Sequence, residues 1–304
     1  MIYTGDIVKS NLGIHKGEEM MELDKLINFH SNKNRLERVK KNIKNIVPFI
    51  GAGISKSCGL YLWQELLDKL AVEYFTPAQI KNLKFTHDVF GYADEIVAAA
   101  GNLDMVMKRI GEIFDEAETV HTEIPSLLVS SFSPMIVTTN YDTLLEEDSV
   151  DSPLGAIKPL LPCHIGQMNE AIMLNDRRLL KLHGSVEEIS SLILSTRQYK
   201  KYYGKKGKRG NRMLPIYLKK IFVGRKVLFV GCSLDKDYTL DILEECVKHD
   251  HSISHFAILP YLSNLEQQVK RQRKLTRLGI EAIYYPEGDY EAVDQLIHYL
   301  ADDR

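Results

Sequence analysis

The sequence contains few cysteines, and none of them are grouped. The four are spread along the 304 residues at Cys58, Cys163, Cys232 and Cys246, and no two form a C-x-x-C pair. A disulfide framework or a structural zinc site needs ligands at closer and more regular spacing. We therefore expect a protein without disulfide bonds and without zinc.

Long apolar runs and an excess of one charge are also missing. No apolar stretch approaches the roughly 18–20 residues that span a bilayer, and the first residues lack the apolar core of a secretory signal. The 39 Lys and Arg nearly balance 41 Asp and Glu, so the net charge of −2 gives no general reason to expect nucleic-acid or membrane partners. With 44% hydrophobic and 26% charged residues, the composition is that of a globular protein, which we expect in the cytoplasm.

Apolar residues are arranged in a pattern that alternates between strands and helices. The expected strands are 46–50, 134–138, 179–182, 192–194, 226–230, 255–259 and 282–285. The expected helices are 62–74, 237–249, 264–278 and 290–301. Such alternation predicts an α/β fold with a doubly wound, mostly parallel sheet.

Two stretches lie outside this alternation. Residues 77–131 have almost no strand-like run, and their apolar residues recur at helical spacing, which predicts a helical insertion. Residues 1–45 precede the sheet, and an interrupted helical stripe that includes Met20 predicts a segment packed on the body or on a neighbouring subunit. We expect an N-terminal helical extension over 1–45 and one α/β domain over 46–304.

The first chemically informative segment is V-P-F-I-G-A-G-I-S, residues 47–55. A strand that ends at Gly51, Ala52 and Gly53 and then opens a helix lets backbone N–H groups approach a pyrophosphate. The alternative is a tight turn with a purely structural reason for its glycines. The usual dinucleotide pattern G-x-G-x-x-G is not met, because Lys56 stands where the third glycine would be.

Three later segments also follow expected strands: T-N-Y-D at 139–142, L-H-G-S at 182–185 and G-C-S-L at 231–234. The amide of Asn140 can both donate and accept hydrogen bonds, although an Asx turn with Asp142 as helix cap is an equally good interpretation. A lone histidine at a strand end, such as His183, is more often structural than catalytic, although an imidazole has the titration range of a general base and Gly184 would leave its ring approachable. We interpret Cys232 as a small buried thiol.

Taken in order, these four segments resemble the boxes of the sirtuin superfamily, and most closely its prokaryotic antiphage-defence branch, as in Thoeris or sirtuin–HerA systems. The resemblance covers roughly residues 46–235. It implies a Rossmann-like fold in which the helical insertion replaces the sirtuin zinc module. It also implies NAD as substrate, with Asn140 and His183 as catalytic residues: the asparagine positions water beside the nicotinamide ribose and the histidine acts as general base.

The same resemblance implies the residues that bind the rest of the dinucleotide. It places Gly51, Ala52, Gly53 and Ser55 at the pyrophosphate, Asp142 near the nicotinamide end, and Gly231, Ser233 and Leu234 at the adenosine half. Two departures separate the chain from deacetylases of this superfamily: the aspartate and arginine that follow their GAGIS box are missing, and so are four grouped cysteines. Protein deacetylation is therefore disfavoured.

The resemblance implies an enzyme that hydrolyses NAD to ADP-ribose and nicotinamide and depletes NAD during infection. Such an activity would need control by assembly, so we expect a homo-oligomer, with a HerA-type ATPase or another sensor protein as partner. The chain is then an effector subunit or a segment of a longer protein. Two alternatives stay open: a non-catalytic NAD or ADP-ribose sensor, and a protein ADP-ribosyltransferase or deacylase.

A basic run at residues 200–212 holds seven Lys and Arg, two tyrosines and three glycines. Tyrosines can stack on bases while lysines contact phosphates, so nucleic-acid binding is one interpretation. Charge runs more often form solvated loops, and a mobile loop near the mouth of the site is the interpretation we favour.

Overall fold

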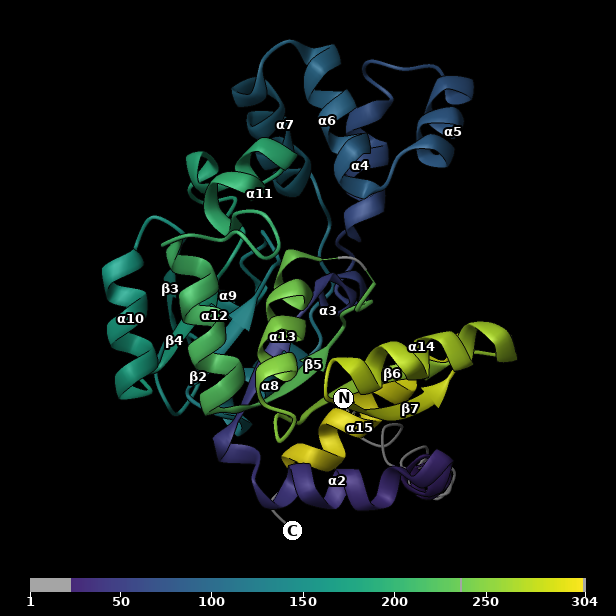
Figure 1. Ribbon diagram of the computed structural model, residues 1–304, viewed down its shortest axis with the longest axis vertical. Coiled ribbons are helices and arrows are strands. Elements are labelled where there is room, and N and C mark those ends of the chain that lie inside the picture. Colours follow the sequence, from purple (N-terminus) through teal and green to yellow (C-terminus); the bar gives the residue numbers. More distant parts are fainter. Residues whose placement is uncertain (1–22, 236, 303–304) are drawn as a thin grey trace, which may run out of the picture.

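The computed structural model describes residues 23–235 and 237–302, in which seven parallel strands form one sheet with the order β3-β4-β2-β1-β5-β6-β7 (Figure 1). The strands are β1 (Ile46–Ile50), β2 (Met135–Thr138), β3 (Lys158–Leu160), β4 (Arg178–Lys181), β5 (Lys226–Val230), β6 (His255–Tyr261) and β7 (Ile280–Pro286). The central strand is β1, and the chain winds outward from it to both sides. The predicted α/β fold with a doubly wound parallel sheet is confirmed.

Helices cover both faces of the sheet (Figure 1). One face packs against α10 (Ile165–Leu174), α12 (Met213–Gly224), α13 (Tyr238–His249) and α14 (Leu265–Arg277). The other packs against α2 (Asn32–Lys41), α3 (Ala52–Ser57), α8 (Glu123–Ser131), α9 (Leu144–Glu147) and α15 (Glu291–Ala301). Side chains of β1 alternate between these two cores, with Val47 and Phe49 in one and Ile46 and Ile50 in the other. Burial on both faces is typical of parallel strands.

The described part of the N-terminal stretch covers the edge strand β7. Residues 23–28 are helical and lead through the 3-10 turn η1 (Phe29–Ser31) into α2, which contacts β7 and α15. Asn32 pairs with the edge like a strand residue: its Nδ2 donates to Tyr284 O at 2.7 Å, and its Oδ1 accepts from Tyr284 N at 2.8 Å. Unpaired sheet edges invite association with other chains, and this contact satisfies the edge from within.

The apolar stripe of this stretch is buried within the same chain. Leu36 and Val39 are fully enclosed by the core that also holds α8 and α15. Met20 lies outside the described residues. The sequence left open whether this stripe packs on the body of the molecule or on a neighbouring subunit. Its described part packs on the body of the same chain.

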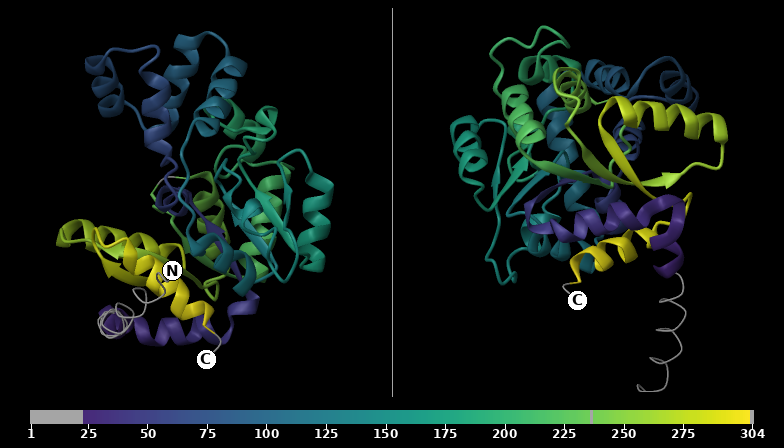
Figure 2. Two further views of the ribbon diagram at one scale, coloured as in Figure 1. Left: turned by 180° about the vertical axis from the view of Figure 1, so that it is seen from behind. Right: turned by 60° about the horizontal axis from the view of Figure 1, so that its bottom comes forward.

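A helical lobe stands beside the carboxyl edge of the sheet (Figure 2). It consists of α4 (Trp63–Ala71), α5 (Pro77–Thr86), α6 (Val89–Ala100) and α7 (Leu103–Asp115), which enclose a core of their own. The expected insertion at 77–131 is helical, although its last helix, α8, packs on α15 beneath the sheet. The domain boundaries themselves stay a prediction.

Some elements differ from those expected. Residues 192–194 are buried without forming a strand and follow the 3-10 turn η3 (Ile189–Ser191), because they pack between the lobe and the sheet. The sequence patterns did not predict four elements: β3, α10, α11 (Thr196–Tyr203) and α12. The 3-10 turn η2 (Ile43–Asn45) leads into β1. Among the described residues, no helix combines the length and apolarity needed to cross a bilayer.

Candidate functional site

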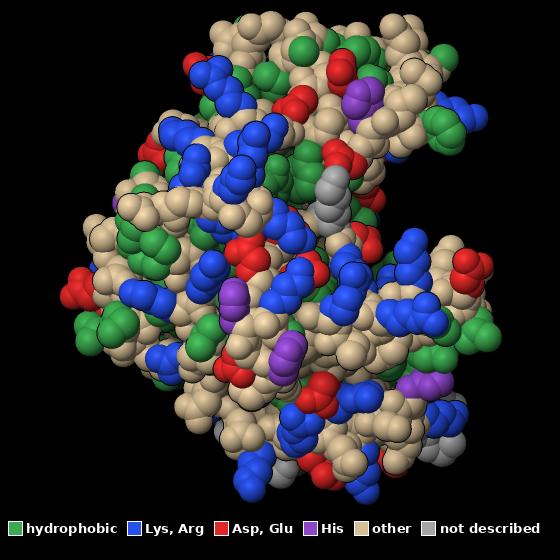
Figure 3. Space-filling view, viewed as in Figure 1, with side chains coloured by type: hydrophobic (Ala, Val, Ile, Leu, Met, Phe, Trp, Pro, Cys, Tyr) green, Lys and Arg blue, Asp and Glu red, His purple; other side chains and the backbone are tan. Residues whose placement is uncertain are grey.

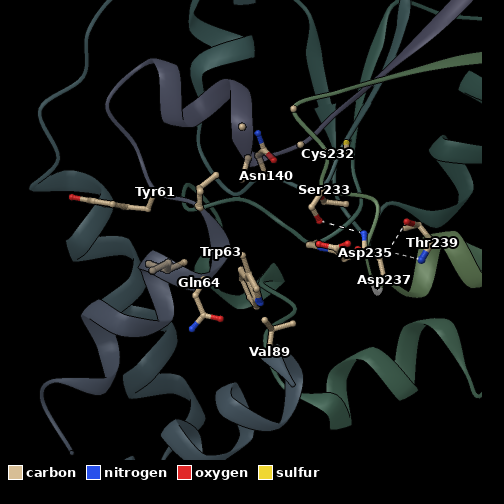
Figure 4. A pocket seen from close by; sticks show the side chains of 18 of the residues that line it. Tyr61, Trp63, Gln64, Val89, Asn140, Cys232, Ser233, Asp235, Asp237 and Thr239 are labelled. Carbon is tan, nitrogen blue, oxygen red and sulfur yellow. Dashed lines mark hydrogen bonds between the residues drawn. The ribbon is translucent and has the colours of Figure 1, made fainter. Parts of the chain in front are cut away.

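The four sequence segments follow four neighbouring strands. Gly51 comes directly after β1, Asn140 after β2, His183 after β4 and Gly231 after β5, and these strands are adjacent in the order β4-β2-β1-β5. Since all strands are parallel, the segments meet at the carboxyl edge, where the chain changes direction and open α/β sheets bind ligands. All four residues line one pocket of about 620 Å³ (Figure 4), a size suited to a small-molecule ligand.

The glycine turn after β1 is locked against the end of β5. The N–H of Gly51 donates to Val230 O and that of Gly53 to Gly231 O, both at 2.9 Å. A Cβ on Gly53 would lie 2.8 Å from Gly231 Cα, and Gly231 has φ +67°, which favours glycine. Close backbone approach therefore explains these glycines without a ligand. Pyrophosphate binding by this turn stays a prediction, with Ala52 lining the pocket between the two glycines.

Asn140 is held by a buried relay through Ser55 of the glycine-turn segment and Asp142 of its own segment. Its Nδ2 donates to Ser55 Oγ at 2.8 Å, and Ser55 Oγ donates to Asp142 Oδ2 at 2.6 Å. Asp142 also accepts from Leu144 N at 3.3 Å, so the expected Asx turn at the start of α9 forms as well. The Oδ1 of Asn140 is buried and has no partner among the described residues. Ser55 thus orients Asn140 from beneath the pocket, while Asn140 and Asp142 line it.

Lys181, which the sequence analysis did not single out, fixes the same turn from below. It is completely buried at the end of β4, and its Nζ donates to Glu146 Oε1 at 2.7 Å and to the carbonyl oxygens of Asp142 and Tyr141. Burial raises the pKa of the Glu146 carboxyl. The only signal in the sequence was a charged residue at the end of an otherwise apolar strand.

His183 lies in the pocket wall with both ring nitrogens engaged. Its Nε2 is 3.0 Å from the hydroxyl of Tyr203 and its Nδ1 is 3.3 Å from that of Tyr199, both on α11. Burial lowers the pKa of His183 to about 4, although the nearby Asp237 carboxylate opposes the shift. The imidazole is therefore neutral at physiological pH. The sequence analysis missed both tyrosines, because no helix was expected over 196–203 and the run that holds Tyr203 was interpreted as a loop.

The residues flanking His183 and Gly231 have structural roles. Gly184 has φ +92°, and a Cβ there would lie 2.4 Å from Ser191 O, so close packing and not access to the ring requires this glycine. Cys232 donates to Phe49 O at 3.5 Å, and burial raises the pKa of its thiol. Cys232 was expected to be a small buried thiol, but it is only half-buried and lines the pocket, while its raised pKa still disfavours a reactive thiolate.

The segment after β5 forms the wall expected to hold the adenosine half (Figure 4). Ser233 and Leu234 line the pocket, and Leu234 adopts a left-handed backbone with φ 54°, which is unusual for a residue with a side chain. Asp235 and Asp237 follow in the same wall, and Asp237 caps α13 by accepting from Thr239 N at 2.6 Å. Placement of the adenosine here stays a prediction.

The opposite wall comes from the helical lobe, and sequence analysis missed it entirely. Its lining residues include Tyr61, Leu62, Trp63, Gln64, Lys84, His87, Asp88, Val89 and Phe90. Figure 3 shows the surface hollowed between the lobe and the body. Trp63 packs edge-to-face on Tyr141 at 5.5 Å between ring centroids and so joins the two walls. Only the tertiary fold brings these residues to the strand ends.

The basic run at 200–212 forms part of α11 and a tethered loop. Arg209 pairs with Glu245 at 2.9 Å, and Lys206 pairs with Asp241 and Glu244 at 2.8 and 2.6 Å, all on α13. Several of its charges are therefore neutralised within the molecule, although Figure 3 shows Lys and Arg side chains still exposed around α11. Nucleic-acid binding there stays untested.

The described residues include no group of three or more His, Cys, Asp or Glu side chains that could hold a metal ion. The expected absence of zinc stays a prediction.

Comparison with known proteins supports the resemblance drawn from the motifs. Residues 134–283 match the family model of the SIR2-like domain, which spans three of the four segments. The chain is 25% identical over 274 residues to NAD(+) hydrolase ThsA of Bacillus cereus (84% of this chain, 53% of the relative). It is 28% identical over 159 residues to NAD(+) hydrolase ThsA of Enterococcus faecium (52% of this chain, 31% of the relative). These matches therefore span about a third to a half of the relatives' length. The match to the SIR2-like domain over residues 134–283 agrees with the resemblance that the motifs carry.

Proposed function

We propose that this chain hydrolyses NAD at the nicotinamide–ribose bond, giving ADP-ribose and nicotinamide. One observation carries the proposal: Asn140 and His183 line a single pocket at the carboxyl edge of adjacent strands, together with the glycine turns after β1 and β5. Relatives named NAD(+) hydrolase support the choice of substrate and reaction.

The charge of the pocket suits this reaction. Carboxylates of Asp88, Asp142, Asp235 and Asp237 line it. NAD has a positively charged nicotinamide ring, and breaking its ribosyl bond moves positive charge onto the anomeric carbon. The Asp142 carboxylate, which is expected at the nicotinamide end, would stabilise this charge more in the transition state than in the solvated substrate, whereas Asp235 and Asp237 lie in the wall expected to hold the adenosine half. Nicotinamide leaves as a neutral molecule, so the site needs no acid to protonate it.

Asn140 is the residue best prepared to act on the reacting end. Ser55 fixes its nitrogen, which leaves Oδ1 as an acceptor for a water molecule or a ribose hydroxyl. A water held there would be positioned for attack on the anomeric carbon, and such positioning supplies much of the rate of an enzymatic hydrolysis. The role of His183 as general base stays a prediction from the resemblance.

Nicotinamide release from purified protein tests the proposal. Asn140→Ala should slow the reaction by about 10²-fold or more, because it removes the positioned acceptor. Asn169→Ala is the matched control, since Asn169 is on α10, where it accepts from surface Lys220. Lack of nicotinamide release by the wild-type protein at every concentration, with and without a HerA-type ATPase, would reject hydrolysis. NAD binding without turnover would favour the sensor alternative, and ADP-ribose found on protein would favour transfer.

A cellular role in antiphage defence follows as part of the same proposal. An enzyme that depletes cytoplasmic NAD must be restrained until infection, so we expect activity to depend on a homo-oligomer larger than a dimer or on a partner. This expectation now rests on the toxicity of the reaction, because the described part of the N-terminal stripe is buried within the chain. Light scattering alongside the assay tests it: a fully active monomer at micromolar concentration would contradict it.

A further inference from the structure

The hydrogen bonds around His183 run in one direction. Tyr203 is fully buried, and among the described residues its hydroxyl has His183 Nε2 as its partner. If Nε2 carried the ring proton, the hydrogen of Tyr203 would be buried without an acceptor, which is costly. Tyr203 therefore donates to Nε2. In the neutral imidazole the proton is then on Nδ1, and this N–H donates to the hydroxyl oxygen of Tyr199.

This polarity leaves the hydroxyl hydrogen of Tyr199 without an acceptor on His183. Its oxygen accepts from Nδ1, so its own hydrogen needs another acceptor, and Tyr199 lines the pocket whereas Tyr203 does not. His183 has no ring nitrogen left for a ligand while both contacts persist. Of Tyr203, His183 and Tyr199, the Tyr199 hydroxyl is therefore the group that can donate to a ligand.

In the described part of the chain, a second series of hydrogen bonds leaves a free acceptor at the pocket, where the first leaves a free donor. Asn140 donates to Ser55 and Ser55 donates to Asp142, which leaves the Asn140 Oδ1 as a buried acceptor without a partner among the described residues. One wall of the pocket thus offers an acceptor and another offers a donor. A hydroxyl group can donate to the first and accept from the second.

We propose that Tyr199 donates a hydrogen bond to a hydroxyl of the nicotinamide ribose, and that His183 and Tyr203 are positioning residues that aim it. The choice of ribose rests on the proposed function. The end of α11 is held in place, because Arg209 pairs with Glu245 on α13 and donates to the backbone oxygen of Tyr203 at 3.2 Å. Tyr199 is also stacked on Tyr238 at 4.9 Å between ring centroids, which limits its movement.

Calorimetry with two ligands tests the contact without any turnover. ADP-ribose retains the distal ribose, and ADP lacks it. Tyr199→Phe should weaken ADP-ribose binding by about 3- to 10-fold, as expected for one neutral hydrogen bond, and leave ADP binding unchanged. Tyr217→Phe, a buried tyrosine of α12 that does not line the pocket, is the control and should change neither. Equal effects on both ligands, or no effect on ADP-ribose, would overturn the proposal.

A separate experiment tests the direction of the hydrogen bonds from Tyr203 through His183 to Tyr199. It measures the ¹⁵N chemical shifts of the histidine rings, and the signals that disappear in His183→Gln are those of His183. The wild-type protein should show a neutral His183 with its proton on Nδ1, and Tyr203→Phe should shift the population toward Nε2–H. A proton on Nε2 of His183 in the wild-type protein would contradict the proposed direction of the hydrogen bonds, and therefore the role of Tyr199 as a donor. If neither readout fails but NAD is not cleaved, the proposed hydrolysis alone is wrong, because the ribose contact is measured with ADP-ribose.

Discussion

The two walls of the pocket are built in different ways. The wall from the sheet is fixed by buried contacts between residues far apart in sequence, such as Ser55 with Asp142 and Lys181 with Glu146. The wall from the helical lobe depends on amphipathic helices and surface ion pairs, such as Lys84 with Asp68 and Arg109 with Glu73. Buried networks hold atoms in one arrangement, whereas exposed pairs add little rigidity. We therefore expect the sheet wall to be the more rigid of the two.

The largest effect should come from breaking the sheet wall at Lys181. Lys181→Met leaves Glu146 buried without its cation and releases the carbonyl oxygens of the 140–142 turn. We expect a loss of about 3–5 kcal/mol in the free energy of unfolding, measured in urea. Adding Glu146→Leu should restore part of it, and Lys158→Met, an exposed lysine of β3, is the control. A loss below about 1 kcal/mol for the single variant would show that this wall is not held as described.

Acid should also destabilise the fold, through His183 in the sheet wall and through His255 at the start of β6. Burial lowers the pKa of His183 to about 4 and that of His255 to about 3, so the unfolded chain binds their protons first as the pH falls. Stability should therefore decrease from about pH 6.5 down to about pH 4, by about 3 kcal/mol from His183 alone. Glu146 acts with the opposite sign, because its pKa is raised and its contribution falls as the pH rises.

Urea midpoints between pH 7 and 4 measure this dependence. His183→Gln should reduce the slope, since Gln does not titrate. A wild-type midpoint that stays constant from pH 6.5 to 4.5 would contradict the neutral buried state of both histidines.

A smaller effect is expected in the lobe wall. Lys84 and Asp68 are 2.6 Å apart, but both are more than a third exposed, so Lys84→Met should change the free energy of unfolding by less than about 1 kcal/mol. Raising the salt concentration should shrink even that difference. Lys81→Met, exposed on the same helix, serves as the control. A loss as large as that of Lys181→Met would remove the contrast between the walls.

The smallest expected effect is that of metal removal. We predict that chelator leaves nicotinamide release and thermal unfolding unchanged, because the cysteines are scattered and no metal-binding group occurs among the described residues. Elemental analysis of the untreated protein measures the same point. One tightly bound zinc ion per chain would contradict it.

Sequence patterns could predict the sheet wall because its residues follow strands directly. Asn140 and His183 follow the carboxyl ends of β2 and β4, so their position made them candidates, and the family resemblance chose between the functional and structural interpretations. The lobe wall could not be predicted, since Trp63 reaches Tyr141 only through packing of whole helices. The helix α11 was missed because Lys200 and Lys201 open a basic run typical of a solvated loop, although Tyr199 and Tyr203 are buried by the tertiary fold.

The contact between Asn32 and Tyr284 has a consequence for folding during synthesis. The two residues are 252 positions apart. At ribosomal rates of about 5–20 residues per second, α2 must wait roughly 13 to 50 seconds after its own synthesis before β7 exists to receive it. Throughout that interval Leu36 and Val39 lack the β7 part of their native surroundings. A nascent chain paused before β7 should therefore recruit general chaperones to this helix, and release them once the last strand emerges.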